Sequence, residues 1–257
     1  MNNDHKNLAG EYIEAVQKSF IILEGLADCH TAGVSELSRA VDLPKSTVDI
    51  HLQTLKKLGY IVKNEDNSYQ LSLRFLEHGG RIRKRIDTCH VARAQVDKLS
   101  NKVGEVATIG YEERYQRVLL YRTEPIEGLS DNAPVGQMNR MHWTALGKAL
   151  LSQLPIEEID EVVETFGLPR ATDQTITDRD SLVDEIDQIR EQGYSVEDEE
   201  HITGIRSVAV PLDIKGGNTA ISTVGPKHRM TTDRIENGLV EALRETANII
   251  ELKYEHY

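Results

Sequence analysis

The stretch from residue 34 to residue 73 constrains the fold of this chain more than any other part. It contains two short segments with apolar residues at helical spacing, separated by the break Asp42-Leu43-Pro44. Pro44 suits the first turn of the second helix, because its missing N–H costs nothing there, and Ser35 is expected to cap the first. The second helix should bury one face, made by Val48, Leu52 and Leu55.

A hairpin with a polar tip is expected after the second helix. The strand-like runs 60–63 and 69–73 flank the polar residues 64–68. Two helices joined by a tight turn and followed by a hairpin form a winged helix-turn-helix, which places its second helix in a DNA major groove. We therefore expect a DNA-binding domain over residues 8–78. A preceding helix, expected over 12–27, has an apolar stripe that should face the core: Ile13, Val16, Phe20, Leu23 and Ala27.

The charge of the chain argues against a uniformly DNA-binding surface. Its 257 residues carry 42 acidic and 30 basic side chains, a formal net charge of −12, which opposes non-specific binding to DNA. Basic groups must therefore be concentrated locally, as they are at Arg81, Arg83, Lys84 and Arg85. An acidic total is also typical of proteins from a high-salt cytoplasm, and composition does not decide between these explanations.

Several classes of protein are disfavoured. No apolar run approaches the roughly 20 residues that span a bilayer, and the N-terminal sequence lacks the pattern of a signal peptide, so we expect a cytoplasmic protein without membrane contact. Cys29 and Cys89 are too few and too far apart for a disulfide framework or a zinc module. His142, His201 and His228 lack the spacing of metal ligands. We expect neither a metal nor a cofactor.

Catalysis is also disfavoured. The pair Gly147-Lys148 fails as a phosphate-binding loop, because the first glycine of that pattern would fall at His142 and Ala149 replaces the required Ser or Thr. No Ser/His/Asp or Cys/His set has a mechanistic spacing, although catalytic groups need not be close in sequence. An enzyme would have to turn over the metabolite that it binds, and we expect no catalytic site.

The remainder of the chain predicts a linker and an α/β domain, so the overall class is α+β. A single linker helix is expected over 79–103, and the second domain over 104–257. Strand-like segments are 105–111, 117–123, 207–214 and 219–225, and helical segments are 143–154, 155–166, 181–194 and 232–252.

The exposed face of the second short helix is the candidate DNA-reading surface. Hydroxyl and amide groups reach base edges or phosphates, isoleucine contacts a thymine methyl, and lysine holds the backbone. Asp49 is unusual there, because it would repel phosphate, although it could accept from a cytosine amino group. The candidate DNA-binding residues are Lys45, Ser46, Thr47, Asp49, Ile50, His51, Gln53, Lys57, Arg81 and Arg83. The alternative is that the helix face and the basic stretch are only solvated surfaces.

Separated motifs over nearly the whole chain resemble the IclR family of transcriptional regulators. The matching segments are 43–48, 52–55, 58–60, 144–151, 175–177, 190–194, 199–200, 204–205 and 208–211. The resemblance implies a winged-helix domain joined by a linker helix to a GAF-like effector domain. It also implies a homodimer or a dimer of dimers, for which a palindromic double-stranded DNA operator is expected. Relatives often carry basic or aromatic residues where this chain has Asp49-Ile50-His51, so base preference cannot be carried over.

The resemblance further implies a small-molecule effector in the second domain. In relatives the pocket uses a helix start, an acidic position before a Glu-Glu pair, and a small polar residue at the head of the next strand. The candidate effector-binding residues are Thr144, Ala145, Leu146, Glu197, Asp198 and Ser207. The free N–H groups of a helix start favour a carboxylate, which an ionised Glu197 would repel unless the ligand also carried a hydroxyl or a cation. We therefore expect a bifunctional effector, such as a hydroxy acid or an amino acid.

The resemblance thus implies a transcriptional regulator, either repressor or activator, of a catabolic operon. Its effector would be a small organic acid, a sugar derivative or an amino acid. Two alternatives remain open at this point. The effector-site residues could be plain helix packing and a solvated acidic loop, and the protein could be a metabolite sensor that acts through protein–protein contacts rather than DNA.

Overall fold

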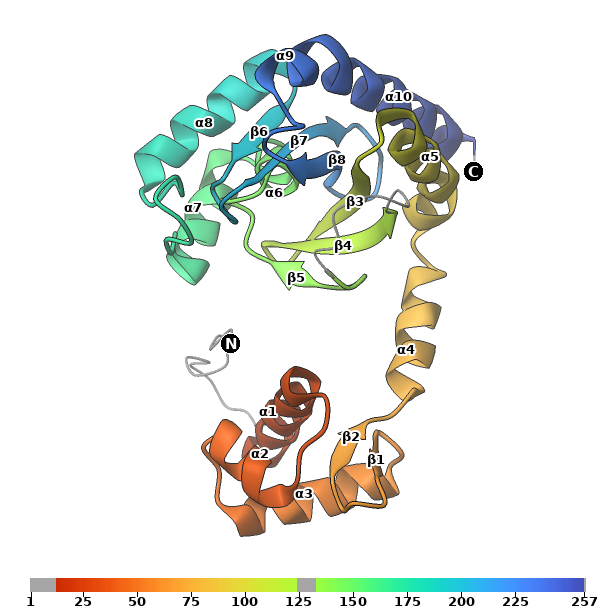
Figure 1. The fold of residues 1–257 in the computed structure, drawn as a ribbon, viewed down its shortest axis with the longest axis vertical. Coiled ribbons are helices and arrows are strands. Elements are labelled where there is room, and N and C mark those ends of the chain that lie inside the picture. Colours follow the sequence, from red (N-terminus) through yellow and green to blue (C-terminus); the bar gives the residue numbers. More distant parts are fainter. Residues whose placement is uncertain (1–12, 124–132, 257) are drawn as a thin grey trace. The chain divides into compact units, whose positions relative to one another are not determined.

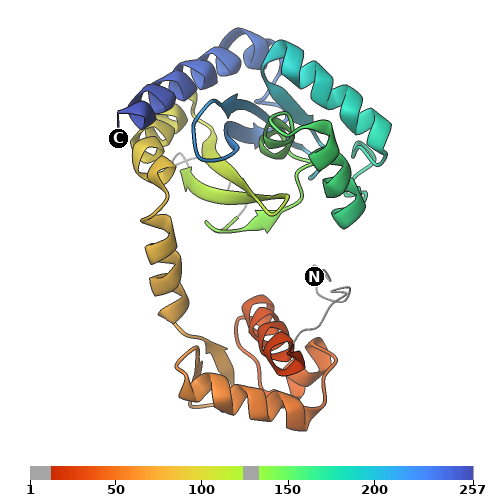
Figure 2. The same cartoon turned by 180° about the vertical axis from the view of Figure 1, so that it is seen from behind.

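The structure is a computed structural model that describes residues 13–123 and 133–256. The chain divides into two compact units, Met1–Ile82 and Arg83–Tyr257, shown in Figures 1 and 2. Each unit is described by itself. Among the described residues, no helix combines the length and the apolar character needed to cross a membrane.

The first unit is a winged helix-turn-helix, as the sequence predicts. Its elements are α1 (Glu14–Cys29), α2 (Val34–Ala40), α3 (Lys45–Lys57), β1 (Ile61–Lys63), β2 (Tyr69–Leu71) and most of α4 (Arg74–Arg83). β1 and β2 pair antiparallel, and Ala32 forms a further bridge with Tyr69. This bridge attaches the start of α2 to the hairpin. Ser35 is not the cap of α2, because the helix begins one residue earlier and Gly33 occupies the N-cap position.

The core of the first unit confirms the predicted inward face of α3 and corrects that of α1. Val48, Leu52 and Leu55 are buried. On α1 the buried residues are Ile22, Leu23, Gly25 and Leu26, whereas Ile13, Val16 and Phe20 are 72%, 51% and 57% exposed and Ala27 is exposed as well. The helix is apolar on two sides. Close packing selects the glycine side, because a Cβ at Gly25 would lie 2.5 Å from Val41.

The linker is two helices rather than the single helix expected over 79–103. α4 ends at Arg83, and α5 (Asp87–Val103) starts anew after Ile86, which has an extended backbone. The break between α4 and α5 falls where buried apolar residues begin. Every residue of α4 in the described chain is exposed or half-buried, whereas α5 buries Val91, Val96 and Leu99. Asp87 in the first turn of α5 favours a new helix start there.

A six-stranded sheet forms the centre of the second unit. Its strands, in the order β5-β4-β3-β8-β7-β6, run antiparallel to their neighbours. They are β3 (Val106–Glu113), β4 (Gln116–Thr123), β5 (Met138–Asn139), β6 (Ser195–Asp198), β7 (Ile205–Leu212) and β8 (Thr219–Pro226). The four predicted strands are confirmed, and the two short strands β5 and β6 were not predicted.

Helices cover the sheet on both faces. One cluster packs α5, the π-helical turn η2 (Ile235–Leu239) and α10 (Val240–Glu255) against Val208, Val210 and Leu212 of β7. The short helix α9 (Thr232–Arg234) precedes η2 and buries no residue. α5 and α10 lie side by side in Figures 1 and 2. The other cluster joins α6 (Ala145–Leu151), α7 (Ile156–Phe166) and α8 (Arg179–Gln192) to Ala209 and Ala220. This alternation along β7 determines which side chains face α6.

Candidate functional site

The outward face of α3 presents most of the candidate DNA-binding residues. Lys45, Ser46, Asp49, Gln53 and Lys57 are exposed, Ile50 is 66% exposed, and Thr47 and His51 are half-buried. A large apolar side chain held in water is available to contact a base methyl group. The structure therefore brings these residues together on one helix, as predicted.

Two of these residues are already engaged within the domain. Nδ1 of His51 lies 2.9 Å from Oγ of Ser19 on α1. Nε2 of Gln53 donates to the hydroxyl of Tyr69 in the hairpin, at 3.2 Å. These contacts tie α3 to α1 on one side and to the hairpin on the other, so they orient the helix within its unit.

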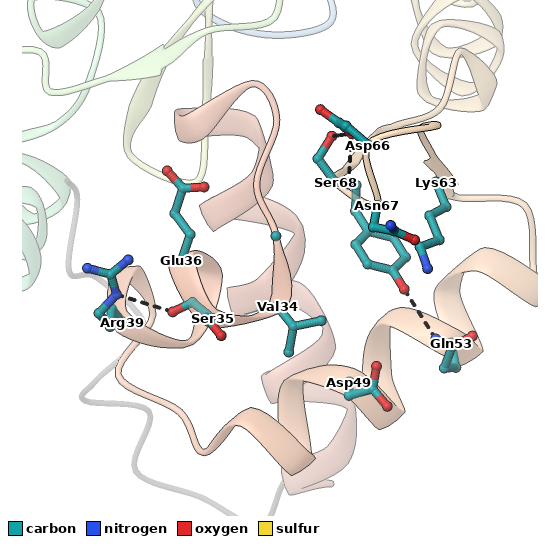
Figure 3. A pocket seen from close by; sticks show the side chains of 12 residues that line it. Val34, Ser35, Glu36, Arg39, Asp49, Gln53, Lys63, Asp66, Asn67 and Ser68 are labelled. Atoms are coloured by element: carbon teal, nitrogen blue, oxygen red, sulfur yellow. Dashed lines mark hydrogen bonds between the residues drawn. The ribbon is translucent and has the colours of Figure 1, made fainter.

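A groove of about 560 Å³ lies between the start of α2, α3 and the hairpin tip (Figure 3). Its charged lining residues are Arg39 and Lys63, together with the acids Glu36, Asp49 and Asp66. The tip is ordered by Asp66, whose Oδ1 accepts from both the backbone N–H and the hydroxyl of Ser68, at 2.9 and 2.7 Å. The groove is thus a preformed concave surface next to the outward face of α3.

The basic pair Arg81 and Arg83 lies at the end of α4. Nη2 of Arg81 pairs with Oε1 of Glu77 one turn earlier, at 2.5 Å, and both arginines are exposed. The start of α4 is attached to the segment between α3 and β1. Arg74 donates to the carbonyl of Leu58 at 2.5 Å, and its guanidinium lies 4.8 Å from the Tyr60 ring.

In the second unit, the start of α6 contains three of the candidate effector residues. Thr144 is the N-cap, and its hydroxyl accepts from the backbone N–H of Gly147 at 3.1 Å. Ala145 and Leu146 follow and are buried. Gly147 is required by the packing, because a Cβ there would lie 2.3 Å from the carbonyl oxygen of Met141.

Glu197 and Ser207 face each other across β6 and β7 and meet the start of α6. The Ser207 hydroxyl donates to Oε2 of Glu197 at 2.7 Å and accepts from the Ala145 N–H at 3.4 Å. Ser195, two residues before Glu197 and on the same side of the strand, donates to the Ala145 carbonyl at 2.7 Å. Candidate residues that lie far apart in the sequence therefore form one hydrogen-bonded chain.

The Glu197 carboxyl is the most perturbed acid of this site. Its side chain is 2% exposed, and burial raises its pKa from 4.5 to about 7, against the hydrogen bonds from Ser207 and from the His201 backbone, which favour the ionised form. A substantial fraction of Glu197 is therefore protonated at neutral pH. This weakens the repulsion that the sequence argument assumed, because a protonated carboxyl can donate to a carboxylate.

Asp198 does not join the other candidate effector residues. As the next residue in an extended strand it lies on the opposite side from Glu197. There it pairs with Lys227 at 2.8 Å and with Arg206 at 3.6 Å. The structure therefore places it in an ion cluster rather than beside the start of α6.

The structure adds polar residues that the sequence argument missed. The hydroxyls of Thr108 and Ser222 lie 2.6 Å apart, and Ser222 pairs with Ala209, which faces α6. Lys148 is 1% exposed and pairs with Glu185 and Glu200, at 2.7 Å each. The alternation of small and polar residues along the strands could have indicated that the hydroxyls of Thr108 and Ser222 share one face of the sheet. The ion pairs of Lys148 have no such local signal, since its partners lie on other elements.

Three aromatic rings stack between the segment before α6 and the loop after β6. The Trp143 ring lies 4.7 Å from that of His142 and 4.9 Å from that of His201. Burial lowers the pKa of His142 to about 4, so this imidazole is neutral at physiological pH. Within the described residues, no group of three or more His, Cys, Asp or Glu side chains is arranged to hold a metal ion.

Comparison with known proteins covers both units. The "Bacterial transcriptional regulator IclR C-terminal" family matches residues 81–252, and the "IclR helix-turn-helix domain" matches residues 15–65. The HTH-type transcriptional regulator KdgR of Escherichia coli K12 is 32% identical, over 87% of this chain and 86% of the relative.

Solved structures share the fold. A putative transcriptional regulator from Rhodococcus sp. RHA1 superposes with a TM-score of 0.80 at 27% identity, over 95% of this chain and 99% of the other. An IclR homolog from Microbacterium hydrocarbonoxydans, complexed with 4-hydroxybenzoate, gives a TM-score of 0.80 at 24% identity, over 95% and 100%. With both units matched in order, the chain belongs to the IclR family of DNA-binding transcriptional regulators, which are not enzymes.

Proposed function

We propose that this regulator controls a catabolic operon in the cytoplasm and responds to a small carboxylic acid that also carries a hydroxyl or amino group. The observation that carries the proposal is the buried chain Ala145–Ser207–Glu197. Buried polar groups are normally paired, and here a backbone N–H, a hydroxyl and a carboxyl converge beside small apolar residues. Such a set recognises a compact polar ligand.

The protonation of Glu197 suits such an acid. A carboxylate at the start of α6 can accept the Ala145 N–H, and a protonated Glu197 can donate to it. The hydroxyls of Ser207, Thr108 and Ser222 can bind a ligand hydroxyl or amine. The 4-hydroxybenzoate in the Microbacterium homolog carries a carboxylate and a hydroxyl, which supports this ligand class.

The DNA contact is proposed to follow the exposed side chains of α3 and the adjacent groove. Lys45 and Lys57 would hold phosphates, and Ser46, Asp49 and Ile50 would face base edges. In the groove Arg39 and Lys63 would take the sugar–phosphate strand. Because His51 and Gln53 are engaged by Ser19 and Tyr69, we assign them to orienting α3 rather than to primary base contacts. Arg81 and Arg83 would add phosphate contacts.

A second copy of the chain is proposed to cover the outer side of α1. Ile13, Val16 and Phe20 form an exposed apolar stripe there, and such contiguous patches mark interaction sites. On α4, Leu76 and Ile82 are 72% and 61% exposed. Two copies joined by these surfaces would present paired α3 helices to a palindromic operator.

The proposal is tested first on DNA. A gel shift on the protein's own upstream DNA, repeated over a range of salt concentrations, should give a logarithmic slope set by several phosphate contacts. Failure to shift that DNA at low salt would favour a sensor that acts through protein contacts.

Effector binding is tested by calorimetry with lactate, gluconate, serine and 4-hydroxybenzoate. The variants Glu197→Gln and Ser207→Ala should weaken whichever acid binds. Glu191→Gln, an exposed acid on α8, should leave the affinity unchanged. Unchanged affinity in both site variants would exclude the assigned pocket.

A further inference from the structure

An ion cluster begins on the reverse side of the strand that holds Glu197. Asp198 Oδ1 lies 2.8 Å from Nζ of Lys227, and its Oδ2 lies 3.6 Å from Nε of Arg206. The Lys227 backbone N–H also donates to the Gly204 carbonyl, at 2.8 Å. The end of β6 is therefore attached to the segment that follows β8.

Arg206 extends this attachment along the same segment. Its Nη1 donates to the Met230 carbonyl at 3.0 Å and to the Thr232 hydroxyl at 3.1 Å. The segment is a tight turn, because the backbone N–H groups of Arg229 and Met230 both donate to the Pro226 carbonyl, at 2.9 and 3.1 Å. Because these bonds join its two ends, displacing one end of the turn is expected to shift the other.

The other end of this turn holds the C-terminus of α5. Glu105, directly after the left-handed C-cap Gly104, has a side chain that is 2% exposed. Its two carboxylate oxygens lie 2.7 Å from Arg229 and 2.7 Å from Arg234. Arg234 also donates to the carbonyl of Val103, the last residue of α5, at 2.6 Å.

Glu105 occupies space that the sheet leaves for it. A Cβ on Gly225 would lie 2.4 Å from Oε2 of Glu105, and Gly225 is the β8 partner of Arg206. A buried carboxylate held by two guanidinium groups has a defined geometry, and removing one partner from such a set is strongly destabilising. The ion cluster around Asp198 and the ion cluster around Glu105 are thus connected by the turn after β8 and by the paired strands β7 and β8.

We propose that Glu105 is a positioning residue that couples the effector site to the linker helix α5. Consecutive residues of β6 point to opposite sides, so a ligand that moves Glu197 also moves Asp198. Asp198 displaces the turn 226–232 through Lys227 and Arg206. The turn carries Arg229 and leads directly into α9, which ends at Arg234, and these two arginines hold Glu105. This assignment rests on the proposed effector role of Glu197, since only that role makes β6 the input.

The test measures amide hydrogen exchange in the last turn of α5, residues 100–104, in the full-length protein without ligand or DNA. Glu105→Gln should raise exchange there about tenfold, by removing charged hydrogen bonds. Asp198→Asn, at the end of β6, should raise it severalfold. The control for Asp198→Asn is Asp160→Asn, which removes a similarly exposed acid from an ion pair with Arg179 at 2.6 Å and should leave α5 unchanged.

The double variant Asp198→Asn/Glu105→Gln decides whether the two residues act in one chain. If they do, it should exchange like Glu105→Gln alone. The coupling would be overturned if the two substitutions multiplied each other's effect on the exchange rate. It would also be overturned if Asp198→Asn left the exchange rate of α5 at the wild-type value. Should Glu105→Gln fail to fold, Arg234→Lys takes its place, because lysine keeps the charge but loses the fork that reaches both Glu105 and Val103.

The outcome is separable from the effector proposal. If the variants show the exchange coupling but no acid binds in calorimetry, the link between Asp198 and α5 is retained and the effector role of Glu197 is rejected. Acid binding at Glu197 without exchange coupling would do the reverse.

Discussion

Replacing Glu197 by Gln should stabilise the second unit at neutral and higher pH. Burial raises the folded-state pKa of Glu197 from 4.5 to about 7. At about 1.4 kcal/mol for each pH unit, ionising this group in the folded protein costs about 3 kcal/mol more than in the unfolded chain. Glutamine has nearly the same shape and can still accept from Ser207, but it never carries the charge.

The sign follows from proton counting. Between pH 4.5 and about 7 the folded state binds more protons at Glu197 than the unfolded state, so this group lowers the free energy of unfolding as pH rises. Below pH 4.5 its contribution is constant, and above about pH 7 the full penalty is present. The wild type should therefore lose about 2 to 3 kcal/mol relative to Glu197→Gln between pH 5 and pH 8.

Trp143 offers a local assay for this difference. It is the only tryptophan of the chain and lies beside the site, 4.9 Å from the His201 ring. Urea unfolding followed by its fluorescence reports on the second unit alone. Subtracting the wild-type profile from that of the variant cancels the other titrations, and Glu191→Gln serves as the exposed control. Parallel profiles for wild type and Glu197→Gln would show that the pKa of Glu197 is not raised in the folded protein.

Further predictions concern DNA, assembly, packing and ligand binding. Lys57→Gln should weaken binding to upstream DNA in anisotropy measurements and reduce the salt slope by about 1; an unchanged slope would remove Lys57 from the interface. Phe20→Asp should convert a dimer into a monomer in light scattering, and a persistent dimer would reject the α1 surface. Gly147→Ala should lower the thermal midpoint, because its Cβ would meet Met141 at 2.3 Å, with a cost of about 1 to 3 kcal/mol. Gly238→Ala, with nothing within 4 Å, is its control. Calorimetric affinity for an acid should fall by up to about tenfold per pH unit above about pH 7, as Glu197 ionises; a flat profile would contradict a protonated partner.

Much of the first unit could be predicted from the sequence because its signals are local. The spacing of Val48, Leu52 and Leu55 determines the buried face of α3. The inward side of α1 could not be predicted in the same way. That helix has apolar residues on two sides, and the choice depends on Gly25 meeting Val41 in three dimensions.

The candidate site of the second unit was only partly predictable. Family motifs place Ala145, Glu197 and Ser207 correctly as neighbours, and the structure adds the bonds between them. β6 is short and polar, so periodicity gave no strand there, and the opposite orientation of Asp198 was hidden. The buried pairs of Lys148 join α6 to α8 and to the loop after β6, which no local pattern encodes.

An acid bound at Glu197 is expected to change the affinity of α3 for DNA. The most direct test is fluorescence anisotropy of labelled upstream DNA, with and without the acid that binds best in calorimetry, for wild type and Glu197→Gln. We expect at least a fivefold change in the DNA dissociation constant for wild type, in either direction, and little change for the variant. An equal response in both proteins, or none in wild type at saturating acid, would contradict it.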